Sequence, residues 1–585
     1  MIALKFVTGL FLGYVLEEGR TIQRDTQTIR LKINGQRHKT QHRKLQTKYH
    51  EPHQIWSMKS VQKIITPLQS HFRSSLRRTS TIASTTAAFP QTDGGNVKTF
   101  SELPGPTGLH DIPYLGMALN FKPFTKYEIL DDFVEVMISF REKYGDIFKV
   151  RAGNKHVLHV CHPDIADQVF RLPYKENHRH FPGMIEAFYK YNDIPRSLSM
   201  RSGKDWAKLR MPSNEHLLKP KAMANFTPLL ERVANDFVDN LKTDLQINDA
   251  VREISKYAYE CVGIASFNKR YGCLNDSSQD EMLNLLNTIL KTLQTAYLMP
   301  FDINRYYKTK TYREFEQTYL QLQEFLKKNM EEQILRLNTM RDEGTLMDYL
   351  QDEYNLIYAM LSDGKLPAEE IVTLISDLHT GAVEGLGNAI TFVLCDLALN
   401  PDKQDTLYEE ITQVAADQSV IGIDALQKMS YLQACIKESQ RLTAPFPGAL
   451  RIPETDVTIA GYRIPKGTNI SINHKMMSLD ERFFPQPTKF LPERWTRDDN
   501  TDVIDKGYQN FPNVIVKPFG FGVRSCAGVR VAKPAMMLSV AKIIQNFEVS
   551  LPNGEKEIKT TRLLFPTPKE PVNMCLKPRQ SSYSS

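Results

Sequence analysis

A short loop around one cysteine constrains this chain more than any other feature. Residues 518–530 read PFGFGVRSCAGVR, in which Phe519, Gly522, Arg524, Cys526 and Gly528 fit the pattern FxxGxRxCxG. In a chain of ordinary composition, five fixed positions recur by chance at about one site in ten million. The two glycines let the backbone curl around the sulfur, and the run 529–547 predicts a helix whose N-terminus faces it. The alternative is a buried structural cysteine between glycines.

Three shorter patterns precede this loop. Glu438 and Arg441 form an ExxR pair one helical turn apart, and Arg494 lies in the segment PERW at 492–495. Further upstream, Trp206 and Arg210 form WxxxR, whose spacing puts both side chains on one face of a helix. ExxR alone is weak, since any solvated helix can carry it. The order of the patterns and their distance from the cysteine make the set specific.

Together these segments resemble the cytochrome P450 family, and the resemblance covers roughly residues 103–578. It implies haem b (iron protoporphyrin IX) as the cofactor, with Cys526 as the axial ligand of the iron. A thiolate ligand has to stay ionised, accept backbone N–H bonds and be shielded from water. A glycine-lined loop that ends at a helix N-terminus meets these requirements.

The resemblance also implies roles for the other motif residues. Cofactor binding is expected of the aromatic, glycine and arginine positions Trp206, Arg210, Arg451, Phe519, Gly522 and Arg524, the tryptophan and the arginines at the haem propionates. Arg451 is a lone arginine, for which a plain surface position is the alternative. Glu438, Arg441 and Arg494 are expected to form a buried network that supports the haem side of the core.

A long helix is predicted over 367–400, where Pro367 suits the first turn and Glu369 and Glu370 favour the N-terminal dipole. Its length is about 50 Å. The family pattern in this helix is [AG]Gx[DE]T[TS], and the chain reads GAVEGL at 381–386. Glu384 keeps the acid, while Gly385 replaces the threonine. We expect Glu384 to assist proton delivery, with an ordered water or a substrate hydroxyl in place of the missing hydroxyl. One alternative is that the chain does not activate O2. The other is that Glu384 is an acid on the surface of the helix with no catalytic role.

Several details resemble the mitochondrial branch, among them the segment WAKLRMPSNEHLLKP at 206–220 and the PERW segment. That branch implies electrons from an adrenodoxin-like [2Fe–2S] ferredoxin and its NADPH-dependent reductase. An acidic partner requires a basic docking face, for which Lys437, Arg530 and Lys533 are the candidates. Gln433 departs from the branch, which usually has lysine there. The alternative is that these charges are merely solvated.

The N-terminal tail carries the excess positive charge. Residues 1–90 hold 15 Lys and Arg against four acids, so the remaining 495 residues sum to −4 although the whole chain is +7. This distribution indicates targeting and excludes a nucleic-acid-binding domain. Residues 58–89 have the Arg- and Ser-rich, acid-free composition of a mitochondrial transit peptide. The alternatives are a solvated tail or an endoplasmic-reticulum anchor at 2–16, although that run is short for a membrane span.

The fold class expected is mainly α (α+β), the cytochrome P450 fold. A large helical domain with a small β-rich part would hold haem between the long distal helix and the cysteine loop. Helices are predicted over 225–242 and 314–337, and a hairpin over 457–473. We divide the chain into a targeting or disordered segment with a hinge, 1–98, and a haem-thiolate domain, 99–585. The seven cysteines contain no CxxC pair, so neither a disulfide framework nor a zinc ribbon is supported.

The resulting hypothesis is a monooxygenase that hydroxylates a hydrophobic small molecule (a sterol, steroid or related lipid) on the matrix side of the inner mitochondrial membrane. By resemblance, the distal pocket would be lined by apolar and aromatic side chains such as Met184, Tyr297, Phe301, Leu450 and Leu564. The segment 296–301 would dip into the membrane surface, giving peripheral association. The rival hypotheses are an O2-independent haem-thiolate isomerase or dehydratase and a non-catalytic haem-binding protein.

Overall fold

The computed structural model describes residues 97–129, 131–172, 174, 178–179, 181–275, 281–298, 303–415, 420–496, 514–552, 555, 557–561 and 566–579. All of them belong to one compact unit, Pro67–Ser585. The expected targeting segment, apart from Val97 and Lys98, lies outside the described residues, as do the expected lining residues Phe301 and Leu564. Lys98 exchanges backbone hydrogen bonds with Gly461 and Arg463 at 3.0 and 2.8 Å, so the ordered fold includes it.

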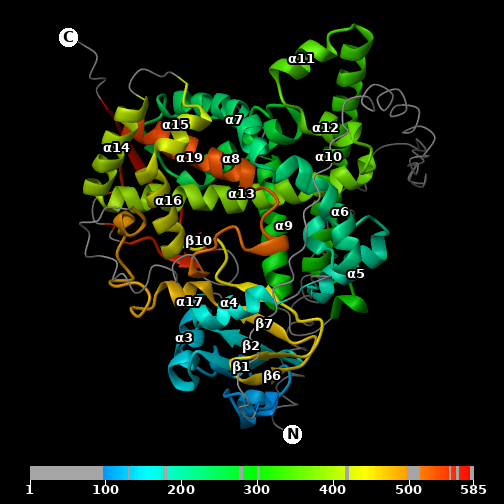
Figure 1. Cartoon of the computed structure of the whole chain (residues 1–585), viewed down its shortest axis with the longest axis vertical. Coiled ribbons are helices and arrows are strands. Elements are labelled where there is room, and N and C mark those ends of the chain that lie inside the picture. The colour runs from blue at the N-terminus through cyan, green and yellow to red at the C-terminus, as the bar shows by residue number, and fades with distance from the viewer. Residues whose placement is uncertain are drawn as a thin grey trace, which may run out of the picture. The chain divides into compact units, whose positions relative to one another are not determined.

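Helix α13 (Ala368–Leu399) forms the centre of the helical part and confirms the long helix predicted from the sequence. It packs against α8 (Ala250–Phe267), α9 (Glu281–Leu298), α10 (Lys310–Asp342) and α19 (Val529–Asn546). Figure 1 shows α13 crossing the helical part beside α8 and α19. A helix that is apolar on nearly all sides is expected in a core. Among the described helices, α13 alone is long and apolar enough to span a membrane, and most of it is buried within the protein.

The remaining helices surround this centre. Helix α7 (Pro220–Leu241) packs on α19 and α8, and with α10 it confirms the two amphipathic helices predicted at 225–242 and 314–337. The others are α3 (Phe133–Tyr144), α4 (Pro163–Arg171), α5 (Gly183–Asn192), α6 (Gly203–Leu217), α11 (Leu346–Asp352), α12 (Leu356–Ser362), α14 (Pro401–Ala415), α15 (Ile423–Lys428), α16 (Ser430–Leu442) and α17 (His474–Ser478). Short 3₁₀ turns include η4 (Leu198–Met200), η7 (Pro492–Trp495) and η9 (Gly522–Arg524).

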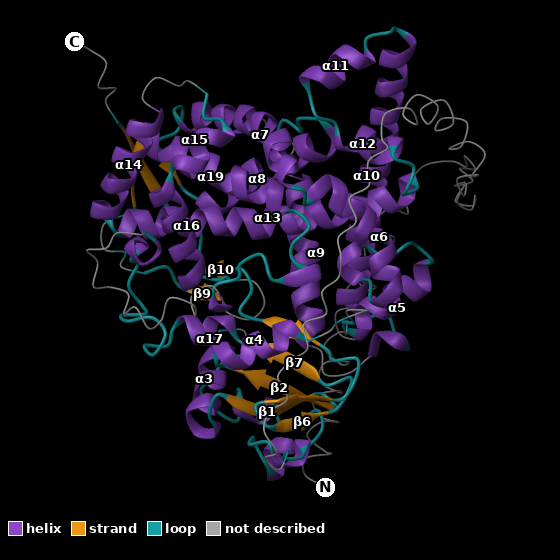
Figure 2. Cartoon of the chain, in the orientation of Figure 1, coloured by secondary structure: helices purple, strands orange, loops and turns teal. Residues whose placement is uncertain are grey.

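The main sheet has four strands in the order β1 (Ile147–Ala152), β2 (Lys155–Val160), β7 (Asn469–Ile472) and β4 (Ala449–Arg451). Strands β1 and β2 form an antiparallel hairpin, whereas β2 pairs with β7 in parallel, with Val157 opposite Asn469. The smaller sheets are β5 (Val457–Ile459) with β6 (Tyr462–Ile464), β3 (Gln246–Ile247) with β11 (Met574–Pro578) and β8 (Phe547–Ser550), and β9 (Thr560–Thr561) with β10 (Thr567–Pro568). Figure 2 shows β1, β2, β6 and β7 together, apart from the helical bulk.

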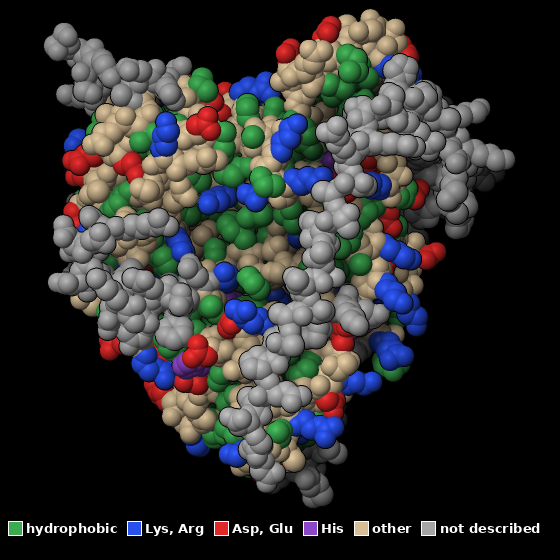
Figure 3. Space-filling view, viewed as in Figure 1, with side chains coloured by type: hydrophobic (Ala, Val, Ile, Leu, Met, Phe, Trp, Pro, Cys, Tyr) green, Lys and Arg blue, Asp and Glu red, His purple; other side chains and the backbone are tan. Residues whose placement is uncertain are grey.

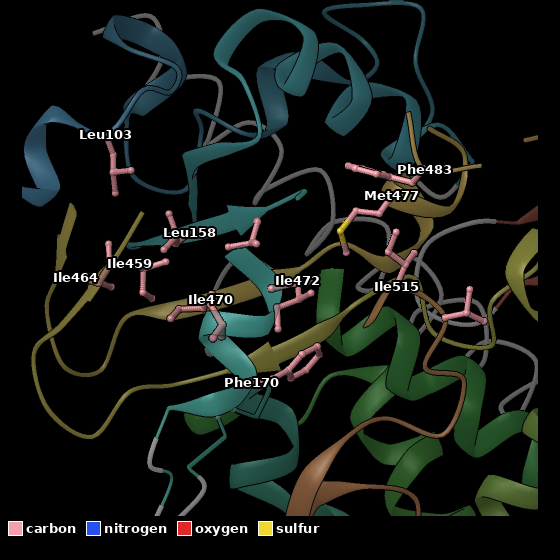
Figure 4. Packing of buried hydrophobic residues seen from close by; sticks show 14 of the residues in the cluster. Leu103, Leu158, Phe170, Ile459, Ile464, Ile470, Ile472, Met477, Phe483 and Ile515 are labelled. Atoms are coloured by element: carbon pink, nitrogen blue, oxygen red, sulfur yellow. The ribbon is translucent and has the colours of Figure 1, made fainter. Parts of the chain in front are cut away.

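The hairpin predicted over 457–473 is correct only in its first half. Strands β5 and β6 form a hairpin with Gly461 at its turn, but β7 leaves it and joins the main sheet between β2 and β4. Alternation of apolar residues along 469–472 does not distinguish the two partners. The pairing of β7 with β2 is determined by an apolar cluster of residues that are distant in the sequence. In this cluster, Ile470 and Ile472 pack with Leu158 of β2 and Phe170 of α4 (Figure 4).

Candidate functional site

The cysteine loop is a tight turn fixed by its own backbone. The N–H of Cys526 donates to the carbonyl of Phe519 at 2.8 Å, and the N–H of Ser525 donates to the carbonyl of Gly522 at 3.0 Å. Gly522 has φ +71°, a left-handed conformation that side chains with a Cβ rarely adopt. The loop ends at Gly528, where α19 begins. The expected cofactor-loop residues Phe519 and Gly522 therefore determine where the sulfur of Cys526 lies.

Cys526 is exposed although protein atoms surround its sulfur, which indicates an internal hollow beside it. Burial among these protein atoms is the largest influence on the pKa of the Cys526 thiol, and it raises that pKa. The backbone N–H groups of Gly528 and Val529 and the guanidinium of Arg210 act in the opposite direction. A Cβ on Gly528 would lie 3.5 Å from Cδ2 of Leu378 on α13. The cysteine loop and α13 therefore lie against each other beside this sulfur.

Four arginines with few acidic neighbours gather at this hollow. Burial and the neighbouring guanidinium groups of Arg179, Arg210 and Arg451 lower the pKa of Arg524 to about 8. A guanidinium keeps its proton in proteins, so a cluster of this kind is stable only beside an anion. The Nε atom of Arg210 is buried and has no hydrogen-bond partner among the described residues. The cluster thus requires a negatively charged group.

The predicted partners of the cysteine loop are brought together as expected. Arg210 of α6 donates to the carbonyl of Ser525 at 2.7 Å, and the guanidinium of Arg524 lies 4.2 Å from the ring centre of Trp206. Arg451 of β4 donates to the carbonyl of Phe521 at 2.9 Å. Arg451, the lone arginine, is therefore fixed at the loop and stacks on Phe170.

The face of α13 that lies opposite the loop is lined with small residues. Gly381 is exposed in the middle of this otherwise buried helix, and Ala382, Glu384 and Gly385 are partly buried. A Cβ at Gly385 would meet no atom within 4 Å. Burial raises the pKa of Glu384 to about 7, and its Oε2 has no hydrogen-bond partner among the described residues. In Figure 3, hydrophobic side chains gather in the hollowed centre of the face shown, bordered by Lys and Arg.

The predicted buried network exists and is fully connected. Arg441 binds both carboxylate oxygens of Glu438 at 2.9 and 2.8 Å, and Nε of Arg494 donates to Oε1 of Glu438 at 3.1 Å. Trp495 donates to Oε2 of the same carboxylate at 2.9 Å. Arg441 also donates to the carbonyls of Ser478 and Pro487. The three predicted residues are at most 4% exposed, so the network ties α16 to η7 within the core.

The three expected docking residues lie near one another. Burial and the charges of Lys517 and Lys533 lower the pKa of Lys437 to about 8. The ammonium of Lys437 lies 3.9 Å from the ring centre of Trp495. Lys533 is exposed at the start of α19, and Arg530 lies one turn earlier. These cations form what we call the basic face: Lys437, Lys517, Arg530 and Lys533.

Gln294 of α9 donates to Oε1 of Glu384 at 3.5 Å and so belongs to the site. Four residues of the site were not found from the sequence: Arg179, Gln294, Trp495 and Lys517. Trp495 follows Arg494 directly, so the PERW segment already contained the signal for it. Lys517 similarly precedes the cysteine pattern. Arg179 and Gln294 lie in segments without a motif, and only the tertiary structure brings them to the site.

Haem b fits this arrangement. Its two propionates supply the anions that the arginine cluster requires, and its iron suits a cysteine sulfur that accepts two backbone N–H bonds. Because burial favours the neutral thiol, binding of the iron is expected to release the thiol proton.

Comparison with known proteins agrees with this fit. The family model for cytochrome P450 matches residues 106–576. The chain is 25% identical over 494 residues to the mitochondrial 1,25-dihydroxyvitamin D(3) 24-hydroxylase of Mus musculus, covering 83% of this chain and 91% of the relative. It is 26% identical to the mitochondrial cholesterol side-chain cleavage enzyme of Oncorhynchus mykiss (87% and 96% covered). It is 29% identical to cytochrome P450 27C1 of Danio rerio (80% and 86% covered). The predicted fold class, haem b and monooxygenase activity are confirmed: the chain belongs to the cytochrome P450 family and is of the mitochondrial type.

Proposed function

We propose that this monooxygenase hydroxylates a sterol, a steroid or a related lipid. The observation that carries the proposal is the small-residue face of α13 across from Cys526, which leaves room for a bulky apolar molecule. Two of the relatives are named for acting on a vitamin D derivative and on cholesterol, which supports the same substrate class. Residues 1–98 would direct the chain to the mitochondrion, and residues 99–585 would form the haem-thiolate domain.

The test is a panel of sterols, steroids and secosteroids added to the ferric protein. We expect a change in iron spin state with a subset of them, and an oxygenated product only with NADPH, reductase and ferredoxin. A product that forms without these would favour the isomerase or dehydratase. A panel that changes nothing in the spectrum would contradict the proposed substrate class.

In the mechanism we propose, haem b would supply the O2 chemistry: with two electrons from the ferredoxin and two protons, one oxygen atom would enter a C–H bond and the other would leave as water. The thiolate of Cys526 would bind the iron, and the backbone N–H groups of Gly528 and Val529 would help to stabilise its charge. Arg179, Arg210, Arg451 and Arg524 would hold the propionates, with Trp206 stacked on Arg524. On the distal side, Glu384 holds a proton on its carboxyl, and the space beside Gly385 accommodates a water that passes it on.

Replacing Gly385 by threonine should leave turnover similar or improve its coupling to NADPH. The new Cβ meets no atom within 4 Å, and its hydroxyl can bond the carbonyl four residues back, as Thr391 does with Gly387 at 2.9 Å. Gly387→Thr is the contrasting variant, because a Cβ there lies 3.0 Å from Oγ of Ser255 and should disturb the packing of α8 on α13. Product and peroxide formed per NADPH are the measurements. A large loss of product with unchanged substrate binding would count against a water filling this space.

The electron donor in this proposal is an adrenodoxin-like ferredoxin that docks on the basic face. Charge complementarity supports an acidic partner there, since Lys437, Lys517, Arg530 and Lys533 gather within reach of the cysteine loop. In this proposal the chain also associates with the inner mitochondrial membrane, on its matrix side. Tyr306, 84% exposed, and Tyr307 at the start of the segment leading to α10 offer apolar surface for it.

Lys533→Glu should raise the KM for ferredoxin about tenfold and leave kcat nearly unchanged, because the reversed charge repels an acidic partner. The effect should shrink as salt is added. Lys327→Glu, an exposed position on α10, is the matched control and should behave as the wild type. Equal KM values for the two variants would remove this face as the docking site.

A further inference from the structure

Gln294 of α9 reaches across to the acid of α13. Its Nε2 donates a hydrogen bond to Oε1 of Glu384 at 3.5 Å, and α9 and α13 pack against each other. Both side chains are partly buried. The other carboxyl oxygen, Oε2, is buried without a hydrogen-bond partner among the described residues. The Gln294 amide is therefore the polar contact that the structure records for this carboxyl.

Within the described part of the chain, no charged side chain lies within hydrogen-bond distance of the Glu384 carboxyl. Burial is the cause of the rise in the pKa of Glu384 to about 7, and the described residues form no ion pair with it that would offset that rise. On α13 itself, Asp377 lies two turns earlier and accepts two hydrogen bonds from Ser199. His379 contacts Tyr271, and burial lowers the pKa of its imidazole to about 4, which leaves it neutral. Burial therefore sets the pKa, and the Gln294 amide is the one polar group among the described residues placed to modulate it.

We propose that Gln294 is a positioning residue that fixes the geometry and the ionisation of the Glu384 carboxyl. An N–H donated to one oxygen stabilises the carboxylate, and in the acid form it places the proton on the other oxygen, Oε2. Gly385 supplies no hydroxyl that would hold the carboxyl instead. The inference rests on the proposed proton-delivery role of Glu384, which Gln294 would support without touching the reacting atoms.

Gln294 and Glu384 belong to different helices, so their separation can change when the helices move. Residues of one helix keep a fixed spacing, whereas the distance from Gln294 to Glu384 depends on how α9 packs on α13. A hydrogen bond of 3.5 Å weakens steeply if the helices separate further. A ligand that moves α9 outward would therefore raise the pKa of Glu384, and one that draws it inward would lower it.

The test is a pH titration of the carboxyl itself, in the ferric haem protein. The C=O stretch of protonated Glu384 is followed by difference infrared spectroscopy and is assigned by its loss in Glu384→Gln. The wild type should titrate with a midpoint near 7. Gln294→Met removes the donor at similar volume and should raise the midpoint by about one unit, which lowers the ionised fraction at pH 7.5 about threefold. Thr295→Val is the matched control, because that hydroxyl bonds the carbonyl of Lys291 instead.

A second variant reverses the sign. Gln294→Lys puts a cation beside the carboxyl and should lower the midpoint by about one unit or more. Identical midpoints in the wild type, the methionine variant and the lysine variant would overturn the proposal. So would a methionine variant whose midpoint is unchanged while its substrate affinity falls, since that result makes Gln294 a substrate contact. Failure of the substrate panel would leave this titration unaffected, because it needs no substrate and no turnover.

Discussion

Cys526→Ser abolishes NADPH- and ferredoxin-dependent product formation, while the polypeptide still folds. A serine hydroxyl is not ionised near neutral pH, so the iron loses the anion that the loop is built to present. At metal sites, changes in residues that merely support a ligand cost about 10–100-fold, so losing the ligand itself should cost more. The measurements are product formed per haem and the far-ultraviolet circular dichroism of the variant.

The matched control is Cys575→Ser. That thiol is only partly buried on β11, and it donates to Oε1 of Gln246 at 3.0 Å, a contact that a hydroxyl reproduces. It should retain wild-type activity. If Cys526→Ser kept substantial turnover while Cys575→Ser lost it, the assignment of the ligand would be wrong.

Glu438→Ala should destabilise the fold more than any other single change in the network. It leaves the guanidinium groups of Arg441 and Arg494 buried without their counter-charge and removes the acceptor of Trp495. Breaking a buried ion pair in this way costs about 3–5 kcal/mol in the free energy of unfolding. We expect loss of bound haem at a lower denaturant concentration, followed by absorbance in the Soret region.

Two variants define the cause of that loss. Glu438→Gln keeps the size of the side chain and some of its hydrogen bonds, so its effect should be intermediate. Glu493→Ala is the neighbouring control: this carboxyl is a quarter exposed, pairs with Lys403 at 3.1 Å and accepts from the hydroxyl of Tyr431 at 2.8 Å. Its removal should cost about 1–2 kcal/mol, less than the loss of Glu438. Equal stabilities for Glu438→Ala and Glu493→Ala would contradict the structural role of the network.

Much of this site could be predicted from the sequence because its chemistry is local in the chain. The loop around Cys526 is closed by bonds among residues 517–528, and Glu438 and Arg441 are neighbours on one helical turn, so short patterns contain them. The long helix could also be predicted from the sequence, since α13 is apolar over most of its length. In each case the residues that interact are separated by only a few positions.

What could not be predicted depends on contacts between distant segments. The pairing of β7 with β2 joins positions about 310 residues apart, and alternation of apolar residues does not encode that partner. Arg179 and Gln294 belong to no pattern, and they reach the site because of how their segments pack against the cysteine loop and α13. Likewise, the charges of Lys437, Lys517 and Lys533 influence one another only in the folded chain.

The central claim is that the sulfur of Cys526 binds haem iron as a thiolate, and carbon monoxide tests it most directly. The purified protein is reduced, exposed to carbon monoxide and compared with the reduced protein alone. Thiolate ligation predicts the red-shifted Soret band of such a complex, and its absence in Cys526→Ser. A wild-type complex whose Soret band lies where histidine-ligated haem proteins have it would contradict the account.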